Sequence, residues 1–158
     1  MANIQKLDDI LEVAVRIERR GMEFYKKLAD MVQSPQAKDA FLFLAAEEEK
    51  HIGIFRQMLE KVADYQPRFK YPGEYGLYLD GVSFLAIKSF EKMDKAIQSK
   101  NIGDALLLAM QVETDSINFY KEIFEHFEGK EKGPIQEVIN EEKKHLAKLL
   151  SLKGMLKL

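Results

Sequence analysis

Two stretches of the chain decide its fold: EEEKHIGIF at residues 47–55 and NEEKKHLAKL at residues 140–149. Each contains a glutamate followed three residues later by a histidine, in a chain that has only three histidines. Residues three apart on an α-helix point to the same side, so each pair presents a carboxylate and an imidazole together. The pairs are Glu48 with His51 and Glu142 with His145.

Both motifs lie within amphipathic segments. Apolar side chains recur around them every three or four residues, which is the period of a helix with one buried face. Ser34 and Pro35 are typical of a helix start, and Pro134 follows the turn sequence GKEKGP and should open the last helix. We expect four long helices, at about residues 4–32, 35–63, 101–128 and 134–152.

The connections between these helices predict how they are arranged. Short turns join the first helix to the second and the third to the fourth, so each pair should form an antiparallel hairpin. The connection at about residues 64–100 is rich in Pro, Gly and Tyr and should contain a shorter helix at about 82–99. A helix of about 28 residues is about 42 Å long, and this connection can span that distance. We therefore predict one all-α domain over residues 1–158, a four-helix bundle of two hairpins joined by a long crossover.

The first and third helices carry two further carboxylates. IERRGMEFY at residues 17–25 and VETDSINFY at residues 112–120 both read as an apolar residue and a glutamate, then five residues, then Phe-Tyr. The second hairpin thus repeats the first about 95 residues later. Glu18 and Glu113 continue the apolar stripes of their helices, so they should face the core and not the solvent.

Four carboxylates in one core would repel and desolvate each other at a large cost. Protons relieve part of that cost, and a cluster of cations relieves it better. Two Glu-x-x-His helices and one glutamate from each of the other two helices make a ligand set for two divalent ions, with carboxylates bridging them.

Composition excludes several other classes of protein. The formal net charge is −2 with mixed signs, which does not indicate a nucleic-acid partner. No apolar run approaches the roughly 18 residues of a membrane span. The absence of cysteine excludes disulfides, thiolate zinc sites and iron–sulfur clusters, so any metal must have oxygen and nitrogen ligands. With no signal-peptide pattern at the N-terminus, we expect a cytoplasmic protein.

The four quoted segments, over essentially the whole chain, resemble the ferritin-like di-iron carboxylate superfamily, and most closely its rubrerythrin-like branch. The resemblance implies a ferritin-like four-helix bundle. Tyr25 and Tyr120 look like the tyrosines that hydrogen-bond carboxylate ligands in that family. The metal ligands that the resemblance implies are Glu18, Glu48, His51, Glu113, Glu142 and His145.

The resemblance also implies a function. The cofactor would be two iron ions, with manganese as the alternative, and the chemistry would take place at the metal pair without a catalytic side-chain nucleophile. We expect a non-haem oxidoreductase that reduces hydrogen peroxide or oxygen with electrons from an external donor protein. Ferritin-like bundles often dimerise, so we expect a homodimer.

Two departures from the family keep other functions open. Rubrerythrins proper carry a rubredoxin domain with cysteine ligands, and they have a further glutamate where this chain has Ser116. An iron-binding ferroxidase or iron-storage protein uses the same type of centre and is the first alternative. A structural bundle with a vestigial metal site is the second alternative. A zinc hydrolase is the least favoured hypothesis.

Several residues near the motifs have simpler interpretations. We expect Glu47, Glu49 and Glu141 to lie on the solvated face, since only the glutamates three residues before the histidines share their stripe. Tyr25 and Tyr120 could be core aromatics, and His126 suits the C-terminal end of a helix dipole. Gly21 and Ser116, three residues after predicted ligands, either let helices approach or leave room beside the metals.

Overall fold

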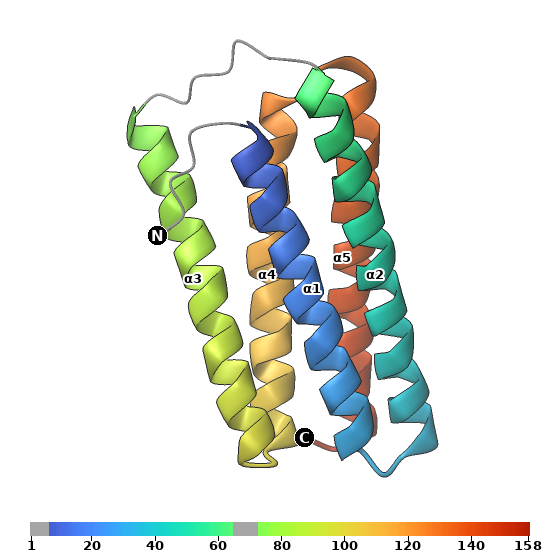
Figure 1. Cartoon of the computed structure of the whole chain (residues 1–158). Helices are drawn as coiled ribbons and strands as arrows, with labels where there is room; N and C mark the ends of the chain where they lie inside the picture. The colour runs from blue at the N-terminus through green and yellow to red at the C-terminus, as the bar shows by residue number, and fades with distance from the viewer. Residues whose placement is uncertain (1–6, 65–72) are drawn as a thin grey trace.

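The computed structural model describes residues 7–64 and 73–158, and these residues form five long helices and one 3₁₀ turn (Figure 1). The described residues include no strand. The elements are α1 (Leu7–Met31), α2 (Pro35–Asp64), α3 (Gly73–Gln98), α4 (Ile102–His126), η1 (Gly129–Glu131) and α5 (Lys132–Met155).

The helices form the predicted two hairpins. α1 and α2 are joined by a three-residue turn and run antiparallel, as do α4 and α5 (Figure 1). Between the hairpins, α3 runs back along the length of the bundle and packs on α4 and α1, so that α4 begins at the same end as α2. This confirms the all-α bundle with one long crossover.

The crossover helix differs from the prediction. We expected a short helix at about 82–99, but α3 has 26 residues and is as long as the helices of the hairpins. The glycines at 73, 76 and 81 belong to the segment that was expected to precede the helix, yet all three lie within α3. An internal glycine costs only about 1 kcal/mol relative to alanine, and packing of the buried Phe90 and Met93 against the bundle outweighs it.

The predicted helix starts are close to the observed ones. Ser34 caps α2, because its Oγ accepts a hydrogen bond from the backbone N–H of Ala37 at 3.3 Å. Asn101 caps α4 in the same way through Asp104 N–H at 3.0 Å. α5 begins two residues before Pro134, which therefore lies in the first turn, where a proline is tolerated.

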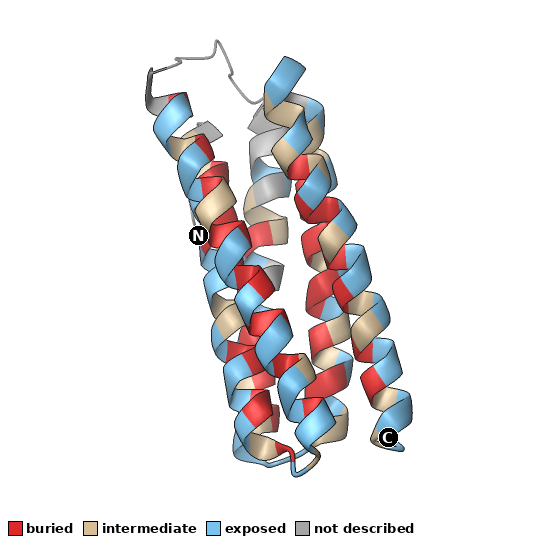
Figure 2. Cartoon of the chain, turned by 90° about the vertical axis from the view of Figure 1, so that its right-hand side faces the viewer, coloured by how far each residue is buried: buried red, intermediate tan, exposed pale blue. Residues whose placement is uncertain are grey.

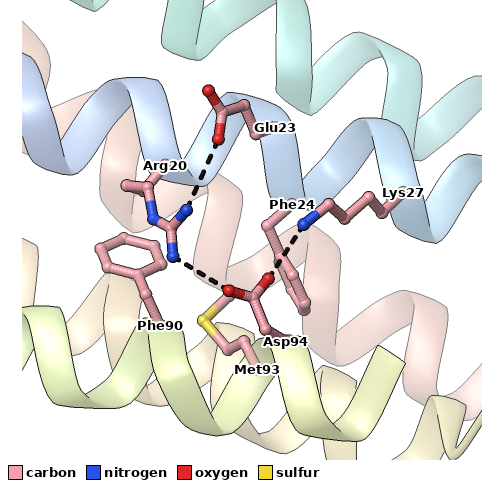
Figure 3. A pocket seen from close by; sticks show the side chains of 7 residues that line it. All are labelled: Arg20, Glu23, Phe24, Lys27, Phe90, Met93 and Asp94. Carbon is pink, nitrogen blue, oxygen red and sulfur yellow. Dashed lines mark hydrogen bonds and ion pairs between the residues drawn. The ribbon is translucent and has the colours of Figure 1, made fainter. Parts of the chain in front are cut away.

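Polar contacts fasten α3 to α1. Asp94 of α3 accepts hydrogen bonds from Arg20 Nη2 and Lys27 Nζ, each at 2.9 Å, and Phe90 lies under the Arg20 guanidinium (Figure 3). These side chains are partly exposed, so each ion pair should contribute about 0.2–1 kcal/mol. Their main effect is to fix which face of α3 lies over the bundle.

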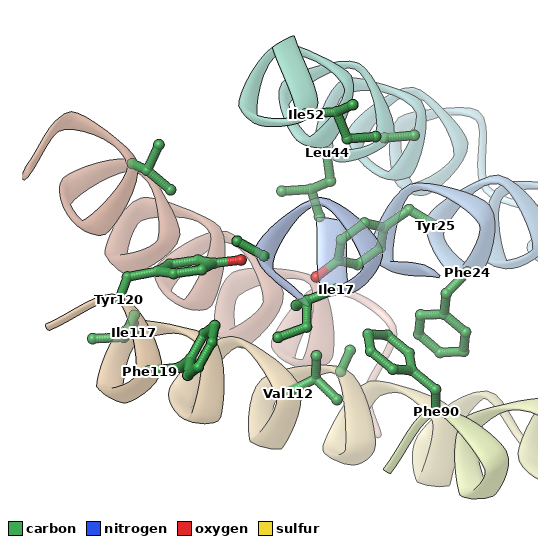
Figure 4. Packing of buried hydrophobic residues seen from close by; sticks show 14 of the residues in the cluster. Ile17, Phe24, Tyr25, Leu44, Ile52, Phe90, Val112, Ile117, Phe119 and Tyr120 are labelled. Atoms are coloured by element: carbon green, nitrogen blue, oxygen red, sulfur yellow. The ribbon is translucent and has the colours of Figure 1, made fainter. Parts of the chain in front are cut away.

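The core runs the full length of the bundle. Buried residues follow one side of each helix and exposed residues the other (Figure 2). Aromatic side chains fill the middle, where the rings of Phe55 and Tyr120 lie with centroids 5.0 Å apart and those of Tyr25 and Phe41 lie 6.5 Å apart. The hydroxyl groups of Tyr25 and Tyr120 point into the space between the helices (Figure 4). In the described ranges, no helix is both long enough and apolar enough to cross a membrane.

Candidate metal centre

Six polar side chains interrupt the apolar core near the middle of the bundle. α1 and α4 contribute one glutamate each, and α2 and α5 contribute a glutamate and a histidine each. None of the six exposes more than 3 % of its surface. They are the six residues predicted as ligands: Glu18, Glu48, His51, Glu113, Glu142 and His145.

The six side chains form two overlapping groups. The first group is Glu18, Glu48, His51 and Glu142, and the second is Glu48, Glu113, Glu142 and His145. Within each group the nearest donor atoms lie within 4.8 Å of one another, which is close enough to hold one metal ion. Glu48 and Glu142 belong to both groups, so each of these carboxylates is placed to bridge two ions.

Both imidazoles turn the same nitrogen toward the carboxylates. His51 Nδ1 lies 3.0 Å from Glu142 Oε1 and 3.2 Å from Glu48 Oε2. His145 Nδ1 lies 3.3 Å from Glu142 Oε2 and 3.5 Å from Glu48 Oε1. The equivalent orientation of the two rings agrees with the internal repeat of the hairpins.

Burial and mutual repulsion strongly shift the pKa values of the carboxylates. Burial, together with the charge of Glu18, raises the pKa of Glu48 to about 8. Burial and Glu142 raise the pKa of Glu113 well above its ordinary value. Burial alone would also raise the pKa of Glu18, but its hydrogen bonds with Glu48 and His51 outweigh burial and lower it.

The pKa values of both histidines are raised, which favours the charged form of each imidazole. Burial would lower the pKa of each imidazole, but the negatively charged carboxylates close to each Nδ1 outweigh this effect. They raise the pKa of His145 to about 11 and also raise that of His51. In the absence of a cation, protons on the imidazoles and on Glu48 reduce the repulsion within the cluster. A divalent ion would displace those protons.

Some buried polar atoms of the cluster lack hydrogen-bond partners, and these atoms indicate whether metal ions fit the site. Within the described residues, neither oxygen of Glu142 and neither ring nitrogen of His145 has a well-aligned hydrogen bond, although all four atoms are buried. Buried polar atoms without partners cost roughly 1–3 kcal/mol each. Metal coordination would satisfy three of these four atoms, and carboxylate and imidazole donors suit iron, manganese or zinc. The residues therefore fit a pair of divalent ions.

Two tyrosines connect the hairpins at the cluster. Tyr25 of α1 donates a hydrogen bond to Glu113 Oε1 of α4, and Tyr120 of α4 donates one to Glu18 Oε1 of α1. Burial and the adjacent carboxylates raise the pKa of both phenols well above the ordinary value, so both remain donors. Each tyrosine orients the glutamate of the opposite hairpin. The spacing of these residues in the sequence does not reveal that the two contacts cross between hairpins.

Comparison with known proteins gives the family. The rubrerythrin family model matches residues 9–153. The chain belongs to the rubrerythrin family. Its structure is also similar to the crystal structure of a Thermotoga maritima protein named as a ferritin-like diiron-carboxylate protein. That similarity has a TM-score of 0.69 and 27 % sequence identity, and covers 94 % of this chain and 95 % of that one. The comparison with curated proteins finds no match.

The membership in the rubrerythrin family and this structural similarity confirm the ferritin-like bundle that the sequence predicted. They also identify a diiron type of protein, and its bundle contains a buried cluster of Glu and His side chains placed to hold metal ions. Glu49 is exposed, as expected. The side chain of His126 lies outside the described residues.

One prediction for this rubrerythrin-family chain was wrong, and a second was incomplete. Glu141 was expected to be solvated, and its side chain is partly exposed, but its Oε2 also lies 2.9 Å from His51 Nε2. Glu47 was also expected to be solvated, but it is buried and accepts a hydrogen bond from Lys50. Glu141 lies at the boundary between α2 and α5 and reaches His51 of the neighbouring helix, whereas Glu47 bonds Lys50 of its own helix. A helical wheel of one helix alone does not show that boundary.

A cavity opens beside the cluster between α1, α3 and α4. It has about 270 Å³ of empty space, counting its mouth, and its wall includes Gly21, Ser116, Tyr25 and Met93. A Cβ atom at position 21 would lie 3.6 Å from the Glu48 carboxylate, in ordinary van der Waals contact with it. The two small residues thus leave room directly beside the carboxylates, as one of the two sequence interpretations suggested.

Proposed function

We propose that the protein is a non-haem di-iron oxidoreductase of the rubrerythrin type, which reduces hydrogen peroxide or oxygen with electrons from a separate donor protein. The observation that supports this proposal best is the pair of overlapping ligand groups that share Glu48 and Glu142. Shared carboxylates allow two ions to lie close enough to react with one small molecule together.

Each residue has a distinct part in holding the ions. Glu18 and His51 would bind one ion, and Glu113 and His145 the other, with the two shared carboxylates between them. Iron at these positions would supply electrons and Lewis acidity. Tyr25 keeps the Glu113 carboxylate oriented from the opposite hairpin, as Tyr120 does for Glu18.

The cavity supports a small oxidant as the substrate. It borders Glu18, Glu48 and Glu113, so a small oxidant that enters it would meet the carboxylates directly. Met93 of α3 contributes an apolar side chain to the wall, which limits the access of bulk water. The crossover helix therefore covers the open side of the centre.

A ferroxidase or iron-storage function is the second candidate. The sequence contains no cysteine that could hold a redox centre of its own, and Ser116 stands where typical rubrerythrins have a further carboxylate. An enzyme that oxidises Fe(II) with O2 needs no donor protein, because its metal substrate supplies the electrons.

Rapid-mixing kinetics distinguish these functions. Protein loaded anaerobically with Fe(II) is mixed with peroxide or with O2, and turnover is followed in the presence of a reduced rubredoxin as the donor. We expect repeated peroxide or oxygen reduction that the Glu48→Gln/Glu142→Gln variant lacks, while the exposed-site control Glu49→Gln retains it. Accumulation of oxidised iron beyond two ions per chain, without sustained consumption of the donor, would favour the ferroxidase. No reaction with either oxidant would leave a structural bundle.

A further inference from the structure

The two hairpins carry almost the same five residues at the metal centre but use them differently. EEEKH at residues 47–51 and EEKKH at residues 141–145 differ only at Glu49 and Lys143. Glu47 is therefore the counterpart of Glu141, and Lys50 is the counterpart of Lys144. Equivalent contacts would be expected for each pair, and the structure shows different ones.

His51 is oriented from behind by a carboxylate. Its Nδ1 faces the metal centre, and its Nε2 donates to Glu141 Oε2 at 2.9 Å. The ring is fully buried, so this contact fixes both its tautomer and its direction. A carboxylate behind a ligating histidine raises the basicity of the imidazole, and loss of such a partner typically weakens metal binding 10–100-fold.

His145 lacks the equivalent contact. Among the described residues its Nε2 has no hydrogen-bond partner, although the atom is buried. The residue that should supply the partner, Glu47, instead accepts a hydrogen bond from Lys50 on its own helix. Glu47 still lies near enough to His145 for the imidazole to contribute to lowering the pKa of Glu47, after the larger effects of Lys50.

The lysines are also used differently. Lys50 lies close to Glu47 and near Glu141, since both carboxylates raise its pKa, Glu47 most strongly. Lys144 forms no ion pair in the part of the chain that the structure describes, and its side chain is exposed. Only the α2 lysine therefore competes with an imidazole for a carboxylate.

We propose that the two metal positions differ in affinity, with Glu141 making the His51 position the tighter one and Lys50 keeping the His145 position weak by holding Glu47 away. The inference rests on the proposed di-metal centre and adds the order in which metal ions occupy its two positions. The His51 position fills first, and the His145 position fills in a separate and weaker step. Glu141, Glu47 and Lys50 act as positioning residues, because none of them is placed to touch the ions.

Four variants in matched pairs test the proposal. Glu141→Ala is compared with Glu47→Ala, and Lys50→Met with Lys144→Met, so that each change has a control of identical charge in the other hairpin. Metal-free protein is titrated with Co(II), whose visible absorption reports histidine and carboxylate ligation. Thermal melts of the metal-free proteins show whether each variant is folded.

The proposal predicts a specific pattern. Wild type should bind Co(II) in two resolved steps, and Glu141→Ala should weaken the first step about 10–100-fold. Glu47→Ala should leave both steps close to wild type. Lys50→Met should tighten the second step, because Glu47 becomes free to turn to His145, whereas Lys144→Met should not.

A rescue and a spectroscopic signal separate positioning from general stability. Glu141→Gln should recover part of the first step, because the amide oxygen still accepts a hydrogen bond from His51 Nε2. The NMR resonance of that Nε2 proton should be shifted strongly downfield in wild type and lose that shift in Glu141→Ala.

Two equal binding steps in wild type, or equal losses in Glu141→Ala and Glu47→Ala, would overturn this inference and leave the di-metal centre intact. A wild-type protein that binds no Co(II) would overturn the inference and the proposed function together.

Discussion

Replacing Glu48 by glutamine should stabilise the metal-free protein while it abolishes metal binding. The unfolded glutamate has a pKa near 4.5, whereas burial raises the pKa of Glu48 in the fold to about 8. At pH 7 the fold must therefore take up a proton that the unfolded chain has already lost. Each pH unit above the unfolded pKa costs about 1.4 kcal/mol, so this uptake costs about 3 kcal/mol at pH 7.

Glutamine removes that cost without removing the contacts. Its amide can donate to Glu18 and accept from His51, as the protonated carboxyl does. A gain of about 3 kcal/mol corresponds to a rise in melting temperature of roughly 6–12 °C for a domain of this size. The stability gain should vanish below about pH 4.5, where both states are protonated, and should increase until the pH passes about 8.

The assay is thermal and urea unfolding of chelator-treated protein at pH 4.5, 7 and 8.5, with Glu49→Gln as a control. Glu49 is exposed and adjacent, so its variant makes the same change of charge without the burial. A Glu48→Gln variant that is less stable than wild type at pH 7, or a gain that is independent of pH, would refute the reasoning.

Three further predictions concern the Tyr25 hydrogen bond, the protons of the metal centre and the packing of the core. Tyr25→Phe removes the hydrogen bond to Glu113 and should reduce the free energy of unfolding by about 1 kcal/mol, as chemical denaturation would show; no change would mean that the bond contributes nothing. Metal binding should release protons, because the raised pKa values of Glu48 and His145 keep both groups protonated at pH 7. The apparent affinity should therefore increase with pH, and calorimetry in buffers of different ionisation enthalpy should count the protons; a pH-independent affinity is the opposing result. Phe41→Ala opens a cavity at a fully buried site and should cost about 3–5 kcal/mol in thermal unfolding, and a loss below 1 kcal/mol would contradict the packing described.

The bundle could be predicted from sequence because its signal is periodic. Apolar residues at helical spacing indicated the long helices, and the repeat of Glu18 and Glu113 on their stripes predicted that carboxylates would enter the core. The Glu-x-x-His spacing predicted which imidazoles would accompany them. The length of α3 was underestimated, because its first part is rich in glycine and tertiary packing against α1 and α4 outweighs the low helix propensity of that residue.

The contacts between helices could not be predicted from either helix alone. That Tyr25 reaches Glu113 of the other hairpin depends on how the hairpins are placed, which no spacing encodes. The contact of Glu141 with His51 has the same origin, since it crosses from α5 to α2. The different hydrogen-bond partners of Glu47 and Glu141 are even harder to predict from sequence, because the residues next to them are almost identical.

The metal content of purified protein tests the central claim most directly. Protein prepared without added metal or chelator, and then loaded anaerobically with Fe(II), is compared with the Glu48→Gln/Glu142→Gln variant, which removes both shared carboxylates and keeps the apolar core. The account predicts about two iron or manganese ions per chain in wild type and none in the variant, with both proteins folded. A wild type that remains free of metal after Fe(II) loading, or a variant that retains two ions, would contradict it.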